Sequence, residues 1–183
     1  IAPFETGFET KDFILITETD LLGERIIRQP KKTKTANFIN DLRDDLMPYI
    51  EANYPVLKEK ENTAIAGLSM GGRETLYIGL SMPDTFGYIG AFTPAPGLLP
   101  YTNFGVSEDG LFTKETLTLL KGSNNFVMIN AGINDGIVSI WPETYHKTLE
   151  ENGVENTFYV TDGGHDFTVW KNGLYNFAKE IFK

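Results

Sequence analysis

The sequence predicts an α/β fold in which a mainly parallel sheet carries helices on both faces. Short apolar runs typical of buried strands alternate along the chain with longer stretches in which apolar residues recur at three- and four-residue steps. No internal repeat, low-complexity segment or second-domain linker interrupts this alternation. In a sheet of this kind the reactive side chains lie at the carboxyl ends of the strands. Candidate site residues are therefore sought directly after each expected strand.

The amino-terminal part is expected to hold one strand and one helix. Residues 11–17 form the strand candidate, and the polar, basic residues 28–35 after it are typical of a surface loop. Residues 36 to about 52 predict a helix, in which Pro48 should introduce a kink because it has no amide donor. The apolar stripe of this helix consists of Phe38, Ile39, Leu42, Leu46, Tyr49 and Ile50.

The remaining elements alternate in the same way. Residues 63–66 are short, partly β-branched and uncharged, which is typical of a buried strand, and residues 73–80 after them predict a helix. A loop rich in proline and glycine is expected from Pro94 to Gly110. Three further strands are expected at residues 87–92, 125–130 and 156–161. The last helix is the clearest, and its single apolar stripe consists of Phe167, Trp170, Leu174, Phe177 and Ile181.

Length and composition indicate one domain and narrow the class of partner. A chain of 183 residues with 41% hydrophobic residues has enough apolar side chains for one core, so residues 1–183 are expected to form a single domain. The formal net charge of -9 disfavours binding to nucleic acid or to an anionic membrane, since both would repel the protein. No apolar run approaches the roughly 18 residues of a membrane span, and the absence of cysteine excludes disulfides.

The clearest chemical signal is the run Gly-Leu-Ser-Met-Gly at residues 67–71, which matches the GxSxG pattern of a nucleophile elbow. A serine on a sharp strand-to-helix turn has strained backbone angles and close neighbours, so glycine is needed two residues before it and two after it. The alternative for so short a motif is a tight turn without chemistry. The expected strand before the motif and the expected helix after it favour a nucleophile at Ser69.

A serine nucleophile needs a histidine to take its proton, and that histidine needs a carboxylate to orient it. Of the two histidines, His165 lies in a loop directly after the last expected strand, whereas His146 lies in the middle of a helix and is expected to be solvated. Asp135 follows the penultimate strand, so the chain order is serine, aspartate, histidine. An ordinary turn residue before glycine is the alternative for Asp135. The sequence predicts that Ser69, Asp135 and His165 form a catalytic triad.

The other polar and aromatic candidates point to structural roles. Asp162 and Asp166 lie close to His165 in the sequence, but this adjacency does not place a carboxylate on the far ring nitrogen. Two histidines without cysteine disfavour a zinc site, and residues 108–110 offer too few ligands for calcium, so no metal is predicted. Trp170 lies on the apolar stripe of the last helix, which favours a place in the core over a substrate platform.

Three stretches resemble carbohydrate esterase family 1, which includes feruloyl esterases and acetylxylan esterases. They are residues 67–72, residues 86–92 with the Pro-Ala-Pro that follows at 94–96, and residues 163–177. The last of them, which contains His165, is the most specific, and the resemblance runs from about Phe13 to the carboxyl terminus. It implies an α/β-hydrolase fold, no cofactor, a secreted protein, and hydrolysis of feruloyl or acetyl esters on xylan-type plant polysaccharides.

The resemblance also implies roles for single residues. Ser69 matches the family nucleophile, His165 the base and Asp135 the acid. Met70 matches the residue whose backbone N–H forms half of the oxyanion hole. Trp170 matches an aromatic residue that lies near the bound substrate in feruloyl esterases of this family, which leaves its role open between core and substrate binding.

The chain departs from the family at its amino-terminal end. Family members carry further strands there, one of which ends in a His-Gly loop that supplies the second oxyanion N–H, and nothing before Phe13 matches it. That strand would lie between the strands at 11–17 and 63–66, so its loss is expected to leave both without their common neighbour. We expect the chain to be the carboxyl-terminal part of a longer domain. Residues 1–12, or a second copy in a homodimer, are the alternative sources of the missing strand.

Three other functions stay open on the sequence. The same fold supports acyl transfer to a sugar acceptor, because fold alone does not separate a transferase from a hydrolase. A non-catalytic, carbohydrate-facing module is compatible with the missing oxyanion loop. A small-molecule esterase or thioesterase is the third.

Overall fold

The computed structural model describes residues 13–17, 38–103 and 105–183. The surface loop expected at residues 28–35 lies outside these residues, as do the first two residues of the strand expected at 11–17. None of the helices in the described segments is long and apolar enough to cross a bilayer.

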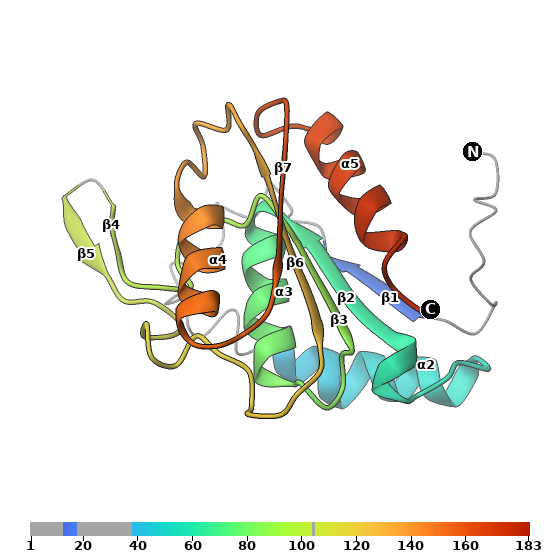
Figure 1. Ribbon diagram of the computed structural model, residues 1–183. Coiled ribbons are helices and arrows are strands. Elements are labelled where there is room, and N and C mark those ends of the chain that lie inside the picture. Colours follow the sequence, from blue (N-terminus) through green and yellow to red (C-terminus); the bar gives the residue numbers. More distant parts are fainter. Residues whose placement is uncertain (1–12, 18–37, 104) are drawn as a thin grey trace, which may run out of the picture.

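Five strands form one sheet at the centre of the fold (Figure 1). They are β1 (Phe13–Thr17), β2 (Thr63–Leu68), β3 (Tyr88–Phe92), β6 (Phe126–Gly132) and β7 (Thr157–Thr161). They lie in the spatial order β1, β2, β3, β6, β7, and every neighbouring pair is parallel. All five correspond to strands that the sequence predicts, so the α/β fold with a mainly parallel sheet is confirmed.

Helices cover both faces of this sheet (Figure 1). On one face lie α3 (Ser69–Ser81) and α4 (Trp141–Glu151), and on the other lies α5 (Phe167–Ala178). Because successive strand side chains point to opposite faces, they divide between two apolar clusters. The cluster under α3 and α4 includes Ile65, Leu76, Ile89, Val127, Ile129 and Leu149. The cluster under α5 includes Ala64, Ala66, Phe92, Met128, Phe177 and Ile181.

The helix expected after residue 36 contains a π-helical stretch. It consists of a turn at residues 38–40, η2 (Asp41–Leu46) and α2 (Met47–Asn53). The π-helical η2 ends two residues before Pro48, and its wider turns relieve the clash of the proline ring with the carbonyl four residues earlier. The wider turns also rotate later residues away from the expected stripe, so Leu46 and Tyr49 are exposed. The expectation that these two residues face the core is therefore wrong.

The segment from Pro94 to Gly110 is not a loop throughout. Within it β4 (Tyr101–Asn103) and β5 (Val106–Glu108) pair as an antiparallel hairpin that projects from the rest of the fold (Figure 1). Three residues per strand are too few for an alternating apolar pattern to stand out, which is why the sequence indicates only a loop.

Tyr145 of α4 anchors the beginning of this segment. Its buried hydroxyl donates to the carbonyl oxygen of Ala95 at 3.0 Å and accepts the backbone N–H of Leu98 at 3.3 Å. Burial raises the pKa of the Tyr145 hydroxyl above its ordinary value, because the phenolate would lose its hydration. The hydroxyl therefore remains protonated and can serve as donor and acceptor together. A short 3-10 helix, η3 (Lys60–Asn62), leads into β2.

The described sheet has no gap between β1 and β2. The two strands pair directly, from Phe13 opposite Thr63 to Thr17 opposite Gly67. The expectation that both lack a neighbour at this position is therefore wrong for this structure, because each strand meets the backbone hydrogen-bonding needs of the other. The pairing also brings the end of β1 to the edge of the sheet at which Ser69 lies, since Gly67 stands two residues before Ser69.

Two glycines let α5 approach the sheet closely. A β-carbon on Gly173 of α5 would lie 2.8 Å from the Phe92 ring and 2.9 Å from the Asn130 side chain. A β-carbon on Gly90 of β3 would lie 3.0 Å from the Phe177 ring. The rings of Phe92 and Phe177 meet edge to face with their centroids 6.1 Å apart. Helix and sheet thus interlock, each placing a phenylalanine over a glycine of the other.

Replacing Gly173 by alanine should destabilise the fold. The added methyl group would meet the side chains of Phe92 and Asn130, which are both buried, so we expect the free energy of unfolding to fall by about 1–3 kcal/mol. Urea unfolding followed by circular dichroism measures the change. Gly136→Ala is the matched control, because a β-carbon there would meet no atom within 4 Å. Equal stability of the two variants would contradict the close packing of α5.

Candidate active site

Ser69 stands where β2 ends and α3 begins. Its φ is +54°, a left-handed conformation that is uncommon for any residue other than glycine. A β-carbon on Gly72 would lie 3.1 Å from the carbonyl oxygens of Gly67 and Phe92, so a larger residue there would require the backbone to shift slightly. The strand, the strained serine and the helix form the sharp strand-to-helix turn that the motif predicts, and whether Ser69 is a nucleophile stays a prediction. The helix begins at Ser69 itself, earlier than the start expected at residue 73.

Three side chains from separate segments meet in one hydrogen-bonded chain. Nε2 of His165 lies 2.9 Å from Oγ of Ser69, and Nδ1 of His165 lies 2.8 Å from Oδ2 of Asp135. Ser69 and His165 are 96 residues apart in the sequence and meet because the parallel strands before them end at the same edge of the sheet. The imidazole is placed to accept the Ser69 proton at one nitrogen while its other nitrogen donates to Asp135.

The two oxygens of Asp135 have separate partners. Oδ1 accepts the backbone N–H groups of Ile137 at 3.0 Å and Val138 at 3.1 Å, and Oδ2 faces His165. The Asp135 side chain is only 2% exposed, so these contacts replace the water that a carboxylate would otherwise bind. The turn after Asp135 therefore sets the direction in which the second oxygen points.

The loop that carries His165 is fixed from two sides. Asp166 caps α5, because its carboxylate accepts two N–H groups of the first helical turn together with the N–H of Gly164. On the other side, a β-carbon on Gly132 at the end of β6 would lie 2.7 Å from the carbonyl oxygen of Gly164. This close approach joins the loop of His165 to the loop of Asp135.

The carboxylates beside His165 in the sequence have other roles in the structure. Asp162 is exposed, and Asp166 directs its oxygens to backbone N–H groups. The carboxylate at the imidazole is that of Asp135, 30 residues away in the sequence. Across residues 13–17, 38–103 and 105–183 no group of three or more His, Cys, Asp or Glu side chains could hold a metal ion.

His146 lies outside the site but is not the solvated residue that the sequence predicts. Its Nδ1 lies 2.8 Å from Oδ1 of Asn156, and its ring stacks on Phe158 with the centroids 4.8 Å apart. The side chain is only 16% exposed. The expectation is wrong because β7 passes along this side of α4 and supplies Phe158 as a packing partner.

Thr93 is a site residue that the sequence analysis missed. It directly follows β3, is fully buried and has a φ of +43°. Its Oγ1 accepts the indole N–H of Trp170 at 2.7 Å and lies 3.3 Å from Nδ1 of His165. The available signal was its place after an expected strand, where reactive side chains of a parallel sheet gather.

Trp170 lies beside the imidazole. Its ring meets that of His165 edge to face, at 89° and with the centroids 5.1 Å apart, and it meets the Phe167 ring in a similar way at 4.9 Å. Phe167 itself is 64% exposed, so the expectation that it shares a core stripe with Phe177 and Ile181 is wrong. The first turn of α5 thus exposes Phe167 beside the site, while Val169 in the same turn and Phe177 further along are buried.

The start of α3 offers one candidate donor for an oxyanion. Met70 is the second residue of α3, so its N–H belongs to the first turn and has no acceptor within the helix. This N–H and the positive end of the helix dipole suit a negative charge that forms beside Ser69. A second donor is not identified within the described part of the chain.

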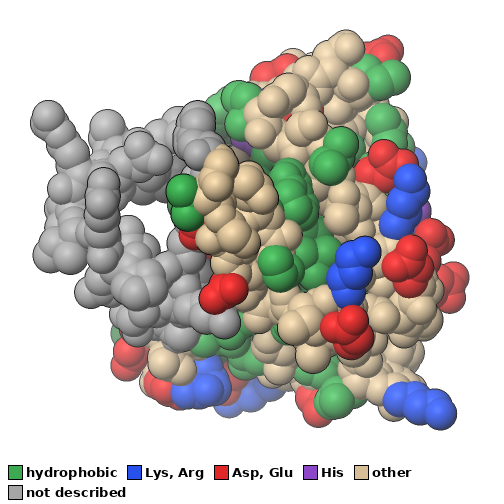
Figure 2. All heavy atoms as spheres, turned by 90° about the vertical axis from the view of Figure 1, so that its left-hand side faces the viewer, with side chains coloured by type: hydrophobic (Ala, Val, Ile, Leu, Met, Phe, Trp, Pro, Cys, Tyr) green, Lys and Arg blue, Asp and Glu red, His purple; other side chains and the backbone are tan. Residues whose placement is uncertain are grey.

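Exposed apolar side chains border the triad. Those adjacent to it in the sequence are Met70, Ile133, Ile137 and Phe167. The face that carries β4 and β5 likewise exposes hydrophobic side chains in its middle, with acidic and basic side chains around them (Figure 2). Such surroundings favour a ligand with an apolar or aromatic group over an anionic one.

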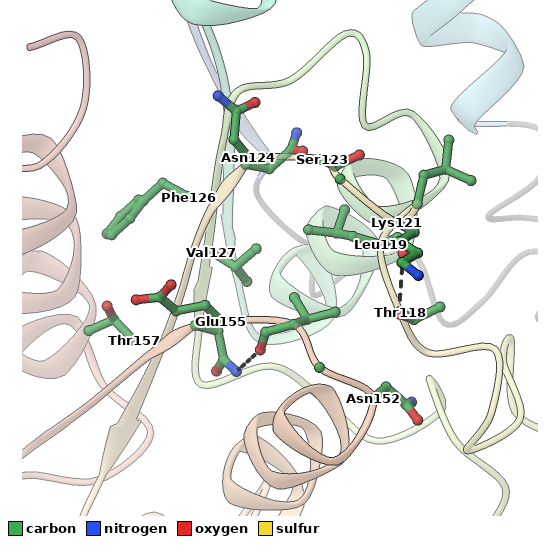
Figure 3. A pocket seen from close by; sticks show the side chains of 16 residues that line it. Thr118, Leu119, Lys121, Ser123, Asn124, Phe126, Val127, Asn152, Glu155 and Thr157 are labelled. Atoms are coloured by element: carbon green, nitrogen blue, oxygen red, sulfur yellow. Dashed lines mark hydrogen bonds between the residues drawn. The ribbon is translucent and has the colours of Figure 1, made fainter.

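A separate cleft lies at the opposite edge of the sheet (Figure 3). It is lined by residues 118–127 and 152–157, where β6 and β7 begin. Asp135 and His165 follow the other ends of these strands, so the length of the sheet separates the cleft from Ser69. The cleft therefore does not form part of the candidate active site.

The chain is similar to known esterases over most of its length. The sequence model of the family described as "Putative esterase" matches residues 17–181. An endo-1,4-beta-xylanase/feruloyl esterase of Xylanibacter ruminicola is 28% identical over 177 residues, which cover 94% of this chain and 22% of that protein. An iron(III) enterobactin esterase of Escherichia coli K12 is 26% identical over 140 residues, which cover 76% of this chain and 34% of that protein.

Solved structures share the fold. A CE1 ferulic acid esterase from Anaeromyces mucronatus, in complex with ferulic acid, superposes with a TM-score of 0.79 at 36% identity and covers 88% of this chain and 61% of its own. An enterobactin esterase from Shigella flexneri superposes with a TM-score of 0.64 at 23% identity, which shows the fold alone. The chain thus spans about a fifth of the bacterial xylanase/feruloyl esterase and about three fifths of the fungal esterase.

Replacing Asp166 by asparagine should reduce the loss of stability in acid. The backbone N–H of Gly164, and then those of Thr168 and Val169, hold the pKa of the Asp166 carboxyl below its ordinary value of 3.8. A carboxyl with a lowered folded-state pKa contributes stability above its unfolded pKa, and this contribution is lost as the pH falls through the folded value. We expect the wild type to lose stability below about pH 4 and the Asn variant, which keeps an acceptor without the charge, to lose less.

Urea midpoints at about pH 6 and about pH 3 measure this difference. Asp84 is also an exposed aspartate, but it lies in a turn and does not cap α5. The control variant is therefore Asp84→Asn. Its pH dependence should equal that of the wild type. An Asp166→Asn variant with the same dependence would contradict the stabilising role of the ionised cap.

Proposed function

Because the chain belongs to the esterase family, we propose that it is a serine carboxylic-ester hydrolase that acts through Ser69, His165 and Asp135. The resemblance to carbohydrate esterase family 1 is confirmed by the CE1 ferulic acid esterase described above. The observation that carries the proposal is the hydrogen-bonded chain from Ser69 through His165 to Asp135, with contacts of 2.9 and 2.8 Å.

In the proposed reaction, Nε2 of His165 takes the proton of Ser69 as Oγ attacks the ester carbonyl. The carbonyl oxygen becomes an oxyanion beside the N–H of Met70 and the amino-terminal end of α3. His165 then gives the proton to the departing alcohol oxygen, and an acyl ester of Ser69 remains. Water gives a proton to His165 as its oxygen attacks this ester, the acid leaves, and His165 returns the proton to Oγ of Ser69. Asp135 accepts a hydrogen bond from the Nδ1–H group throughout and so orients the imidazole.

We propose feruloyl or acetyl groups on xylan-type polysaccharides as the acyl substrates. The relatives named as feruloyl or ferulic acid esterases support this class. The exposed apolar side chains of Met70, Ile137 and Phe167 support it too, because an aromatic acyl group would bury its ring against them. The net charge of -9 suits a substrate without strong negative charge. A secreted location stays a prediction that follows from the polymeric substrate alone.

Ser69→Ala should abolish ester hydrolysis and leave the fold intact. Loss of the nucleophile is expected to lower kcat by on the order of 10⁴-fold or more. The rates are measured on methyl ferulate and on acetylated xylan in parallel, with and without a sugar acceptor so that acyl transfer is detected. A fluorophosphonate probe should label the wild type and not the variant. Hydrolysis that persists in Ser69→Ala would exclude Ser69 as the nucleophile.

Asp135→Asn should lower kcat by on the order of 10³–10⁴-fold, because an amide in place of Oδ2 no longer favours the hydrogen on Nδ1 of His165. Asp162→Asn is the matched control, since Asp162 is exposed in the same loop as His165. Its kcat on methyl ferulate should remain close to that of the wild type. A larger loss in Asp162→Asn than in Asp135→Asn would show that the acid is assigned to the wrong residue.

A further inference from the structure

Thr93 combines three properties that seldom occur together. It is β-branched, its backbone is left-handed with a φ of +43°, and none of it is exposed to solvent. A β-branched residue is strained in this conformation, and such strain persists only where the surrounding structure holds it. The backbone N–H of Thr93 donates to the carbonyl oxygen of Asn130 at 2.8 Å, which fixes the residue against the neighbouring β6.

The Thr93 hydroxyl contacts two residues of the segment that carries the proposed base. Its oxygen accepts the indole N–H of Trp170 at 2.7 Å and lies 3.3 Å from Nδ1 of His165. The direction of the first hydrogen bond is fixed, because an indole nitrogen only donates. When His165 is ready to take the Ser69 proton, its Nδ1 carries a hydrogen, so Thr93 is a second acceptor beside Asp135.

Trp170 adds a packing contact to this hydrogen bond. Its ring stands at 89° to the imidazole of His165. The imidazole thus has Ser69 at one nitrogen, Asp135 and Thr93 at the other, and Trp170 against its ring. The His165 side chain is 11% exposed, so little water is available to replace any of these contacts.

We propose that Thr93 and Trp170 are positioning residues that act as a unit on His165. Trp170 holds the Thr93 hydroxyl, and the two together hold the imidazole in line between Ser69 and Asp135. This inference rests on the proposed function, since it concerns the same base. It differs from the substrate contact that the family resemblance implies for Trp170. A positioning residue affects proton transfer for every ester, whereas a substrate platform affects only those esters whose acyl group reaches it.

Near-isosteric variants separate the hydroxyl from the volume that it fills. Thr93→Val keeps the β-branched shape and removes the hydroxyl, whereas Thr93→Ser keeps the hydroxyl. Trp170→Phe keeps an aromatic ring against His165 and removes the N–H. We expect Thr93→Val and Trp170→Phe each to lower kcat about tenfold on both p-nitrophenyl acetate and methyl ferulate, with KM unchanged within about twofold. Thr93→Ser should keep kcat within about twofold of the wild type.

Two further measurements test whether the residues act as one unit. The Thr93→Val, Trp170→Phe double variant should be no slower than the slower single variant, because both changes break the same link. The rate at which diisopropyl fluorophosphate labels Ser69 should fall by the same factor as kcat, since this small reagent reports activation of the serine. Thr148→Val is the matched control: Thr148 is also buried, and its hydroxyl donates to the Thr144 carbonyl within α4. Its kcat should equal that of the wild type.

Three results would overturn the inference: an unchanged kcat in Thr93→Val, a loss in Trp170→Phe that is confined to methyl ferulate, or fully additive losses in the double variant. Thermal unfolding shows whether each variant folds, and if Thr93→Val does not, the labelling rate of Trp170→Phe decides. A wild type that neither hydrolyses any ester nor accepts the label would overturn the proposed function and this inference with it. An active wild type with unaffected variants would overturn the positioning role alone.

Discussion

The parallel pairing of β2, β3, β6 and β7 is the constraint on which the candidate site depends. Ser69, Thr93, Asp135 and His165 each lie in the segment after one of these strands, and the register of the ladders brings all four strand ends to one edge. A slip by one residue would turn every side chain of a strand to the opposite face of the sheet. The two faces pack against different helices, so the apolar clusters on both sides fix the register of the strands. The register in turn fixes how the four residues are positioned relative to one another along the strand direction.

Backbone strain is concentrated at this same edge. Ser69, Thr93 and Ser139 have left-handed φ angles of +54°, +43° and +49°, and they lie in the segments that follow β2, β3 and β6. Each such residue costs on the order of 1–3 kcal/mol, so the rest of the fold must offset the cost. Close approaches of backbone to backbone, as at Gly72 and Gly132, leave the segments little room to relax. Ser69 and Thr93 therefore keep the positions from which their side chains reach His165.

The direction of each hydrogen bond in the site follows from what its groups can donate and accept. A carboxylate only accepts and an indole nitrogen only donates, so Asp135 and Trp170 fix the two ends of the network. The imidazole between them carries its hydrogen on Nδ1, which leaves Nε2 free to accept the proton of Ser69. The Asp135 carboxylate thus also favours the tautomer of His165 that the proposed reaction needs.

The sequence by itself determined the order of the five strands of the main sheet and of the helices between them, the turn at Ser69, and the positions of Asp135 and His165 directly after strands. These features depend on local apolar periodicity and on the rule that the carboxyl ends of parallel strands lie at the same edge of the sheet. Only the tertiary structure decided that Thr93 and the Trp170 N–H meet at His165, that Phe167 is exposed, that His146 is packed, and that β1 pairs with β2. Each of these depends on which side chains or strand edges from distant segments come into contact. The residue pattern within one segment does not determine which distant segment it will contact.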